Sequence, residues 1–277
     1  MATPAPSTSA LPTPESPIGV FDSGIGGLSV LQALHAELPH QRYVYLADSG
    51  HAPYGEREPQ HVIDRTMAAA EHLIVRHGIQ ALVVACNTAT AIAIHLLRAE
   101  YPQLPLVGLE PAIKPAAQHS RNRRVGVLAT RGTLQSEKFR VLHAGLAQQA
   151  EFILQPCDGL AGAIERQDEE RIATLSAQYT AALGPCGVAP GCIDTVVLGC
   201  THYPLIAPRL RTLLGPDVAM IESGAPVARQ TRRILPQVGT EGTPSTRYFT
   251  TGQIGALQAA ARRWLEADAR VENLDLG

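Results

Sequence analysis

Apolar residues along the chain alternate between short aliphatic runs and longer segments with helical spacing. The runs at 18–21 and 81–85 are rich in β-branched or aliphatic residues, which is typical of buried strands. The segments 29–38 and 61–77 repeat apolar residues every three or four positions, and the second ends at Gly78, a common helix stop. Strands that alternate with helices in this way predict an α/β protein with parallel sheets.

The same order of elements then starts again. Three pairs of segments resemble each other at offsets of 107, 114 and 112 positions: 18–23 with 125–130, the strand through Cys86 with 194–201, and 106–111 with 218–223. Similar offsets in the same order indicate a duplicated architecture. We therefore expect two similar domains, each a parallel sheet flanked by helices, with the active site in the cleft between them, where the carboxyl ends of the strands face each other.

The domain boundaries follow from this duplication. Residues 1–17 are rich in Pro, Ser, Thr and Ala and lack the basic and apolar blocks of a signal peptide, so we expect a disordered leader. Residues 113–225 are expected to form the second domain. The chain after 226 exceeds what a second copy needs, so we expect 18–112 and 226–277 together to form a discontinuous first domain.

Composition excludes several classes of function. Hydrophobic residues make up 45% of the chain, and 25 acidic residues face 23 basic ones, so no basic field attracts nucleic acid. No apolar run approaches the roughly 20 residues needed to cross a bilayer. The five cysteines are odd in number and widely spread, which predicts a reducing, cytoplasmic compartment rather than a disulfide framework.

The most informative cysteines are Cys86 and Cys200, because each directly follows an apolar strand at an equivalent point of the two repeats. A lone buried cysteine usually acts as a small hydrophobe, but a matched pair at strand ends indicates a shared site. A disulfide is an alternative, although such positions more naturally flank a substrate. A metal site lacks support from any Cys-x-x-Cys or His-rich cluster. Two acid/base groups on opposite faces of one carbon would allow racemisation without a cofactor.

Several motifs resemble those of the glutamate racemases, a cofactor-independent aspartate/glutamate racemase family. The resemblance covers about residues 18–267. The segments that carry it are Asp22-Ser23-Gly24 with Gly26-Gly27, Ala47-Asp48 with Pro53-Tyr54-Gly55, Ala85-Cys86-Asn87-Thr88, Leu128-Ala129-Thr130-Arg131-Gly132-Thr133, Gly199-Cys200-Thr201-His202-Tyr203-Pro204 and Tyr248-Phe249-Thr250-Thr251-Gly252.

In such a racemase, Cys86 and Cys200 would be the two acid/base residues, one a thiolate while the other is a thiol. Asp22 ends the first strand in the same half as Cys86, and we expect it to assist that thiol. His202 lies two residues after Cys200 and is expected to assist the second thiol. Glu165 is a further catalytic candidate, because its surroundings resemble the family segment that carries a glutamate of the site.

Small polar side chains are expected to bind the substrate's carboxylates and ammonium group. These candidates are Asp22, Ser23, Asn87, Thr88, Thr130, Thr133, Thr201 and His202. Pro53, Tyr54 and Gly55 resemble the loop whose backbone N–H groups and aromatic ring meet the substrate's side-chain carboxylate. The nearby glycines 24, 26 and 27 lack Rossmann or Walker spacing, and we interpret them as a tight strand–helix turn close to the substrate.

The resemblance implies a glutamate racemase that needs no metal or cofactor, acts in the cytoplasm and supplies D-glutamate for peptidoglycan, and it leaves a homodimer open. The alternatives are a racemase for aspartate or another amino acid on the same fold, a cofactor-free decarboxylase, and a two-lobed amino-acid-binding protein. The decarboxylase needs one catalytic cysteine, and a binding protein needs none. Segment 184–192, which contains Cys186 and Cys192, is interpreted as an inserted surface loop, and Cys157 as structural.

Overall fold

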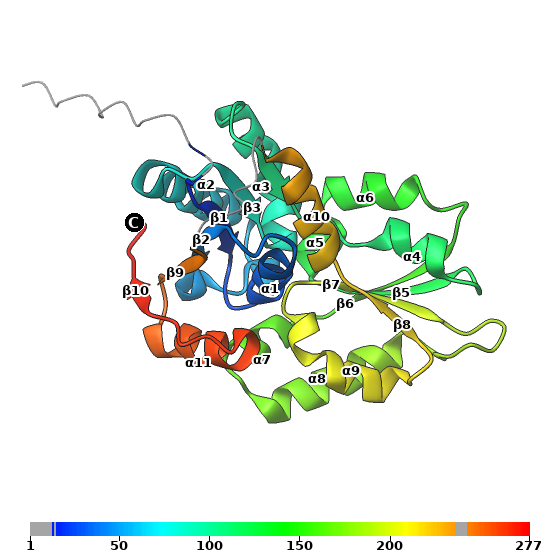
Figure 1. Ribbon diagram of the computed structural model, residues 1–277. Coiled ribbons are helices and arrows are strands. Elements are labelled where there is room, and N and C mark those ends of the chain that lie inside the picture. The colour runs from blue at the N-terminus through cyan, green and yellow to red at the C-terminus, as the bar shows by residue number, and fades with distance from the viewer. Residues whose placement is uncertain (1–12, 14, 236–242) are drawn as a thin grey trace, which may run out of the picture.

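The computed structural model describes residue 13 and residues 15–235 and 243–277 (Figure 1). Their strands form two sheets, and neighbouring strands within each sheet run parallel. Helices flank both sheets, so the predicted α/β class is confirmed. Most of the leader expected at 1–17 lies outside the described residues.

The first sheet has six strands within the described residues, in the order β10-β9-β2-β1-β3-β4. The strands are β1 (Ile18–Asp22), β2 (Arg42–Ala47), β3 (Ala81–Val84), β4 (Leu106–Gly108), β9 (Ser245–Thr250) and β10 (Val271–Asn273). Because β9 and β10 come last in the chain, the chain returns to the first sheet after it has passed through the second. We propose that 18–112 and 226–277 form one domain and 113–225 the other.

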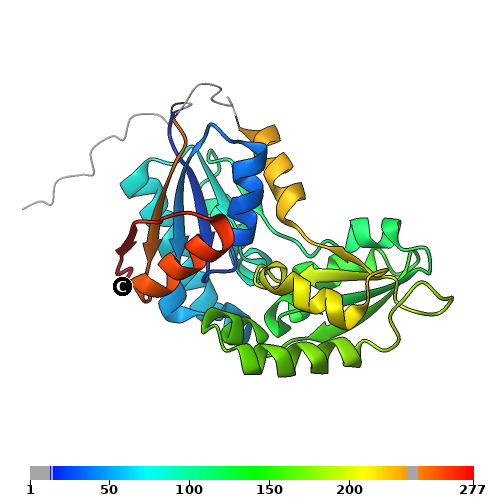
Figure 2. The same cartoon turned by 60° about the horizontal axis from the view of Figure 1, so that its bottom comes forward.

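The second sheet has the order β6-β5-β7-β8 in the part of the chain that the structure describes. Its strands are β5 (Arg124–Ala129), β6 (Glu151–Pro156), β7 (Thr195–Gly199) and β8 (Ala219–Ile221). The order mirrors the central strands of the first sheet, with β5 and β7 in the places of β1 and β3. Figure 2 shows the two sheets as two lobes joined side by side.

Successive side chains of each strand point to opposite faces of the sheet, and helices pack against both faces. Ile18 and Val20 of β1 pack in one cluster with α1 (Leu28–Glu37), whereas Phe21 packs in another with α2 (Pro59–His77). The remaining α-helices are α3 (Asn87–Glu100), α4 (Ile113–His119), α5 (Arg131–Gln135), α6 (Glu137–Ala144), α7 (Leu160–Glu165), α8 (Glu169–Ala182), α9 (Ala207–Leu214), α10 (Gly224–Ile234) and α11 (Ile254–Leu265). The short 3₁₀ helices are η1 (Ser49–His51), η2 (Tyr54–Glu56) and η3 (Tyr203–Ile206).

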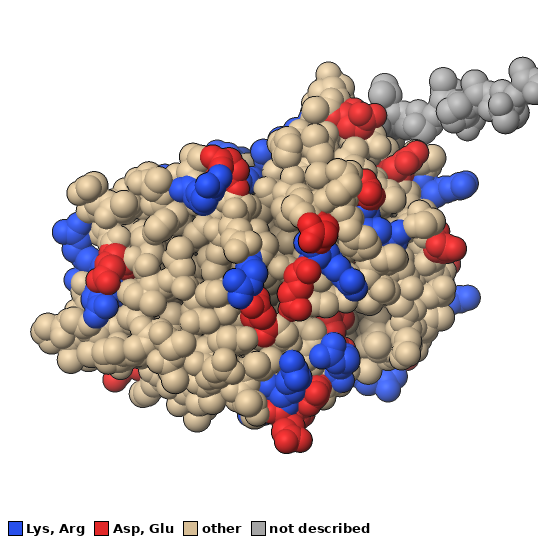
Figure 3. All heavy atoms as spheres, turned by 180° about the vertical axis from the view of Figure 1, so that it is seen from behind, with Lys and Arg blue, Asp and Glu red and all other residues tan. Residues whose placement is uncertain are grey.

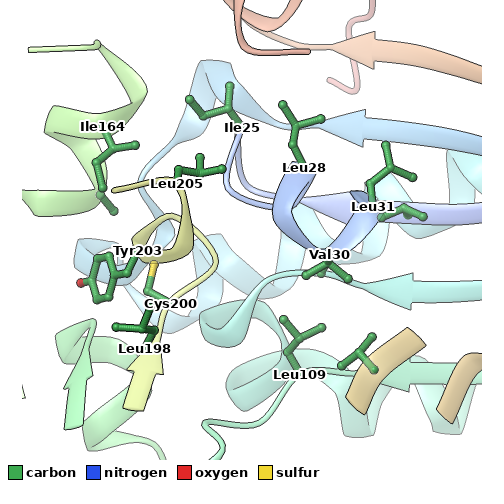
Figure 4. Close-up of a cluster of buried hydrophobic side chains, with 14 of the residues drawn as sticks. Ile25, Leu28, Val30, Leu31, Leu109, Ile164, Leu198, Cys200, Tyr203 and Leu205 are labelled. Carbon is green, nitrogen blue, oxygen red and sulfur yellow. The ribbon is translucent and has the colours of Figure 1, made fainter. Parts of the chain in front are cut away.

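One hydrophobic cluster continues from the first sheet into the second. It contains Leu31 of α1 and Ile25 of the first domain together with Ile164, Leu198 and Leu205 from the second (Figure 4). Burying apolar surface from both sheets in one cluster stabilises their relative position. The two lobes therefore share a packed interior on this side of their junction.

The surface carries no broad field of one charge on the face seen in Figure 3, where basic and acidic side chains are interspersed. The described helices include none that is long and apolar enough to cross a membrane. Segment 184–192 forms a largely exposed turn, and a backbone bridge between Cys186 and Ile193 closes it.

A buried carboxylate anchors the start of β7. The side chain of Asp194 accepts hydrogen bonds from the Ser120 hydroxyl (2.6 Å), the backbone N–H groups of Arg121 (2.8 Å) and Asn122 (2.9 Å), and the Thr195 hydroxyl (3.0 Å). Burial alone would raise the pKa of Asp194, but these hydrogen bonds outweigh it and lower the pKa below its usual value. The ionised side chain thus joins the loop before β5 to the strand that leads to Cys200.

Replacing this carboxylate should destabilise the second domain. Asp194→Asn is expected to lower the free energy of unfolding by about 1–3 kcal/mol, because two backbone donors lose a charged acceptor. The contribution is complete above the unfolded-state pKa of about 3.9 and is lost as pH falls through the lower folded-state pKa. Urea unfolding at neutral and acidic pH measures it, with the exposed Asp217→Asn as the matched control. Equal losses in the two variants would contradict the assignment.

Candidate active site

The carboxyl ends of the central strands of both sheets meet at a small cavity. Its lining residues are Ser23, Pro53, Tyr54, Gly55, Cys86, Asn87, Thr88, Thr130, Ala161, Cys200, Thr201 and His202. The structure therefore brings the two cysteines of the repeats, one from each sheet, to the same cavity. A larger hollow of about 820 Å³ beside Trp264 is lined in part by Glu169, Arg209 and Arg263 and by no thiol.

Cys86 occupies the N-cap of α3, directly after β3. Its Sγ accepts the backbone N–H of Ala89 at 3.5 Å and donates to the Ser23 hydroxyl at 3.6 Å. Burial raises the pKa of the Cys86 thiol to about 12, and the neighbouring Asp22 adds to the rise. At neutral pH Cys86 is thus a thiol, with a hydrogen-bonded route to a carboxylate through Ser23.

Asp22, at the end of β1, is that carboxylate, and it is fully buried. One oxygen accepts from the Ser23 hydroxyl (3.0 Å) and the Gly24 N–H (2.9 Å), and the other accepts from the Thr201 hydroxyl (2.9 Å). Burial raises the pKa of Asp22 to about 6, although the charge of His202 opposes the rise. Its protonation can therefore change near neutral pH, and through Thr201 it touches the half that carries the second cysteine.

Cys200 follows β7 and has a different partner. Its Sγ lies 3.6 Å from Nδ1 of the buried His202, and Nε2 of that ring lies 2.5 Å from Oε1 of Glu165. The same Glu165 oxygen accepts the backbone N–H of Ile25 at 2.7 Å. Burial alone would lower the pKa of His202, but its hydrogen bonds to Cys200 and Glu165 outweigh burial and hold the pKa well above its usual value. A protonated imidazole therefore faces the second sulfur.

The glycines after β1 allow these groups to approach. A Cβ atom on Gly24 would lie 1.8 Å from Oε1 of Glu165, and one on Gly26 would lie 2.5 Å from Nδ1 of His202. Neither distance is compatible with a side chain other than hydrogen. The expected turn is present, and its glycines admit side chains from the other sheet.

Three threonine hydroxyls form a cluster across the junction. Thr88 of α3 lies 2.9 Å from the hydroxyl of Thr130, the N-cap of α5, and Thr130 bonds Thr133 at 2.9 Å. Thr88 and Thr130 line the cavity, whereas Thr133 lies fully buried behind Thr130 and is not among the lining residues. Thr133 is thus placed to orient the neighbouring hydroxyls.

The remaining lining residues provide a free donor and a rigid wall. Nδ2 of Asn87 is buried at the cavity and has no hydrogen-bond partner. Pro53, Tyr54 and Gly55 form one wall, but the Tyr54 hydroxyl points away from the cavity and donates to Asp48 at 2.6 Å.

The sequence predicted no role for Asp48, although the Ala47-Asp48 pair is among the motifs that resemble the family. Its position directly after β2, beside Asp22 at the end of β1, was the available signal, because polar residues at adjacent strand ends gather at one edge of a parallel sheet. The described residues contain no group of three or more His, Cys, Asp or Glu side chains arranged to hold a metal ion.

Each sheet presents a thiol to one buried cavity, Cys86 near Asp22 and Cys200 near His202, an arrangement suited to an enzyme that transfers protons. Two acid/base groups facing one cavity are what a racemase of the two-base type requires. The chain belongs to the Asp/Glu/hydantoin racemase family, whose model matches residues 24–231.

Relatives and solved structures agree with this membership. The chain is 47% identical over 262 residues to the glutamate racemase of Ectopseudomonas mendocina, covering 93% of this chain and 97% of the relative. It is 49% identical over 253 residues to that of Pseudomonas paraeruginosa, covering 91% and 89%. Its fold is similar to glutamate racemase isoform RacE1 of Bacillus anthracis, with a TM-score of 0.83 and 32% identity over 95% of this chain and 99% of that one. The Escherichia coli glutamate racemase in complex with L-glutamate and an activator matches with a TM-score of 0.80 and 29% identity over 93% and 98%.

The close approach at Gly24 gives a direct test of the site. Gly24→Ala should displace Glu165 from His202 and lower racemisation by roughly 100-fold or more. The reason is that a displaced Glu165 no longer holds His202 in place for proton transfer at Cys200. The measurement is the rate of change of optical rotation with an amino-acid substrate. Gly255→Ala, on α11 with open space around its Cβ, is the control and should keep full activity. Unchanged activity in Gly24→Ala would contradict this role of the close approach.

Proposed function

We propose that this protein is a glutamate racemase that interconverts L- and D-glutamate by proton transfer at the α-carbon. The observation that carries the proposal is the cavity shared by Cys86 and Cys200, one from each sheet, in a chain nearly half identical to glutamate racemases along most of its length. Its place would be the cytoplasm, where it would supply D-glutamate for peptidoglycan.

The proposed reaction uses one sulfur on each face of the substrate. A thiolate removes the α-proton, the C–H bond breaks, and its electron pair stays on the α-carbon. The thiol on the opposite face then donates its proton to that pair, so a new C–H bond forms with inverted configuration. The first sulfur ends as a thiol and the second as a thiolate, and the reverse reaction starts from this state.

Each sulfur has its own route for gaining and losing protons. Cys86 can pass its proton through the Ser23 hydroxyl to Asp22, whose pKa of about 6 leaves it mostly ionised at neutral pH. The substrate's ammonium group beside Cys86 would favour the thiolate further, because an opposite charge stabilises the ionised form. On the other face, protonated His202 lies next to Cys200 and is held by Glu165.

The carbanionic transition state needs stabilisation that the cavity lining can provide. The unpartnered Nδ2 of Asn87 and the hydroxyls of Thr88 and Thr130 are donors fixed in a buried site. Preorganised donors in a water-excluded site are commonly the largest contribution to catalysis. The backbone of Pro53, Tyr54 and Gly55 would receive the side-chain carboxylate that distinguishes glutamate from apolar amino acids.

Substrate entry requires the two domains to separate. The cavity has only about 10 Å³ of free volume, room for about one water molecule, and an amino acid is many times larger. A closed cavity of this kind excludes water during the reaction, whereas binding and release need an open form.

The proposal is tested with purified protein, no added cofactor and a panel of L- and D-amino acids followed by circular dichroism. Glutamate should lose its signal from both enantiomers, and aspartate should react far more slowly. Cys86→Ser and Cys200→Ser should each reduce racemisation by several orders of magnitude, because a serine hydroxyl is a far weaker acid than a thiol and is not ionised at neutral pH. Cys157→Ser is the matched buried control. Full activity in either catalytic variant would refute the two-base reaction.

The pKa of Asp22 predicts an acid limit for racemisation of both enantiomers, because L- and D-glutamate are equally stable and kcat/KM must change equally in the two directions. Below about pH 6 the carboxyl is protonated and cannot accept the Cys86 proton, so kcat/KM should fall as pH decreases through this value. Asp22→Asn should lower kcat by roughly 100-fold and remove this limb. Profiles of both enantiomers between about pH 5 and 9 provide the measurement, and an unchanged acid limb in Asp22→Asn would assign it to another group.

A further inference from the structure

We propose that Asp48 and Arg65, neither of which touches the cavity, are positioning residues that fix the cavity wall formed by Pro53, Tyr54 and Gly55. The inference rests on the proposed function, in which this wall receives the substrate's side-chain carboxylate. The structural basis is a buried ion pair whose carboxylate holds the Tyr54 hydroxyl.

The ion pair is bidentate and fully surrounded by hydrogen bonds. Arg65 of α2 donates from Nε to one Asp48 oxygen at 3.0 Å and from Nη2 to the other at 2.9 Å. The first oxygen also accepts the Tyr54 hydroxyl at 2.6 Å, and the second accepts the Thr251 hydroxyl at 2.7 Å. Asp48 is 0% exposed and Arg65 is 6% exposed. The three residues that donate to this carboxylate come from α2, from η2 and from the turn after β9.

This arrangement keeps Tyr54 in one orientation. Burial, followed by the charge of Asp48, raises the pKa of Tyr54 far above its usual value, so the phenol remains a donor throughout the working pH range. Hydrogen bonds to a buried charge are among the stronger ones in proteins. The hydroxyl of Tyr54 is therefore held at Asp48, while other atoms of Tyr54 line the cavity.

The same wall is confined from the second domain. A Cβ on Gly55 would lie 2.5 Å from Cβ of Thr130, and a Cβ on Gly132 would lie 3.1 Å from the Gly55 carbonyl oxygen. The backbone N–H of Asp48 also donates to the carbonyl of Asp22 at 2.9 Å. Asp48 thus links the wall to the end of β1, which carries Asp22. Through this link it fixes the position at which the wall meets α5.

Tyr54→Phe is the most selective test, because it removes the hydroxyl and keeps the ring. With a looser wall, the KM for glutamate should rise roughly three- to tenfold, as expected when one hydrogen bond that orders a binding loop is lost. The kcat should change less than about twofold, because the wall holds the substrate equally in the ground and transition states.

Tyr43→Phe is the matched control. Tyr43 is also buried in the first domain, and its hydroxyl donates to the carbonyls of Leu34 and Leu38 at 3.0 Å, away from the cavity. This variant should lose a similar amount of thermal stability with no change in KM. If Tyr54→Phe loses stability but keeps the wild-type KM, or loses kcat instead, the positioning role is overturned.

The ion pair itself is tested by Asp48→Asn and by the neutral double variant Asp48→Asn/Arg65→Gln. Asp48→Asn leaves Arg65 buried without its counter-charge and should lower stability strongly. The double variant should recover part of that stability while its KM stays raised, because the wall still lacks its anchor. A double variant with wild-type KM would overturn the proposal. Wild-type protein inactive on glutamate would instead refute the proposed function.

Discussion

The site depends on the close approach between the turn after β1 and two segments of the other half, the residues after β7 and the C-terminal end of α7. Across this contact, Thr201 donates to Asp22 and the Ile25 N–H donates to Glu165. Gly24 has no Cβ to obstruct it. Each sheet thereby contributes a hydrogen-bonding partner to the acid or base of the other. If the two turns stood a side chain further apart, the thiols would belong to two separate pockets.

The two sulfurs occupy equivalent places in the fold but not equivalent surroundings. Cys86 communicates with a buried carboxyl through the Ser23 hydroxyl, and burial holds its thiol proton firmly. Cys200 faces an imidazole that keeps its own proton because Glu165 balances its charge. The matching strand order of the two sheets explains the geometry of the pair, whereas the different neighbouring residues explain its chemistry. Burial raises the pKa of Asp22 to about 6, and hydrogen bonds to Cys200 and Glu165 hold the pKa of His202 well above its usual value.

Much of this could be predicted from the sequence, because the relevant signals are local. An aliphatic run that ends in Cys86 or Cys200 predicts both a strand and the place where its side chain emerges. The hydrogen bond of the Tyr54 hydroxyl to Asp48, away from the cavity, and the burial of Thr133 were not predictable, since both depend on how the chain packs. The ion pair of Asp48 and Arg65 was not predictable from the sequence either. A charged residue in an amphipathic helix is usually solvated, and only the packed structure shows which one is buried.

The unequal surroundings of Cys86 and Cys200 have a thermodynamic consequence. L- and D-glutamate are mirror images and have equal free energies in water, so no enzyme can favour one at equilibrium. The ratio kcat/KM must therefore be identical for the two enantiomers, however different the residues on the two faces. The asymmetry described above can appear only in kcat and KM taken separately, which must then differ by the same factor. The enantiomer that is bound more tightly would have the lower KM and, by the same factor, the lower kcat.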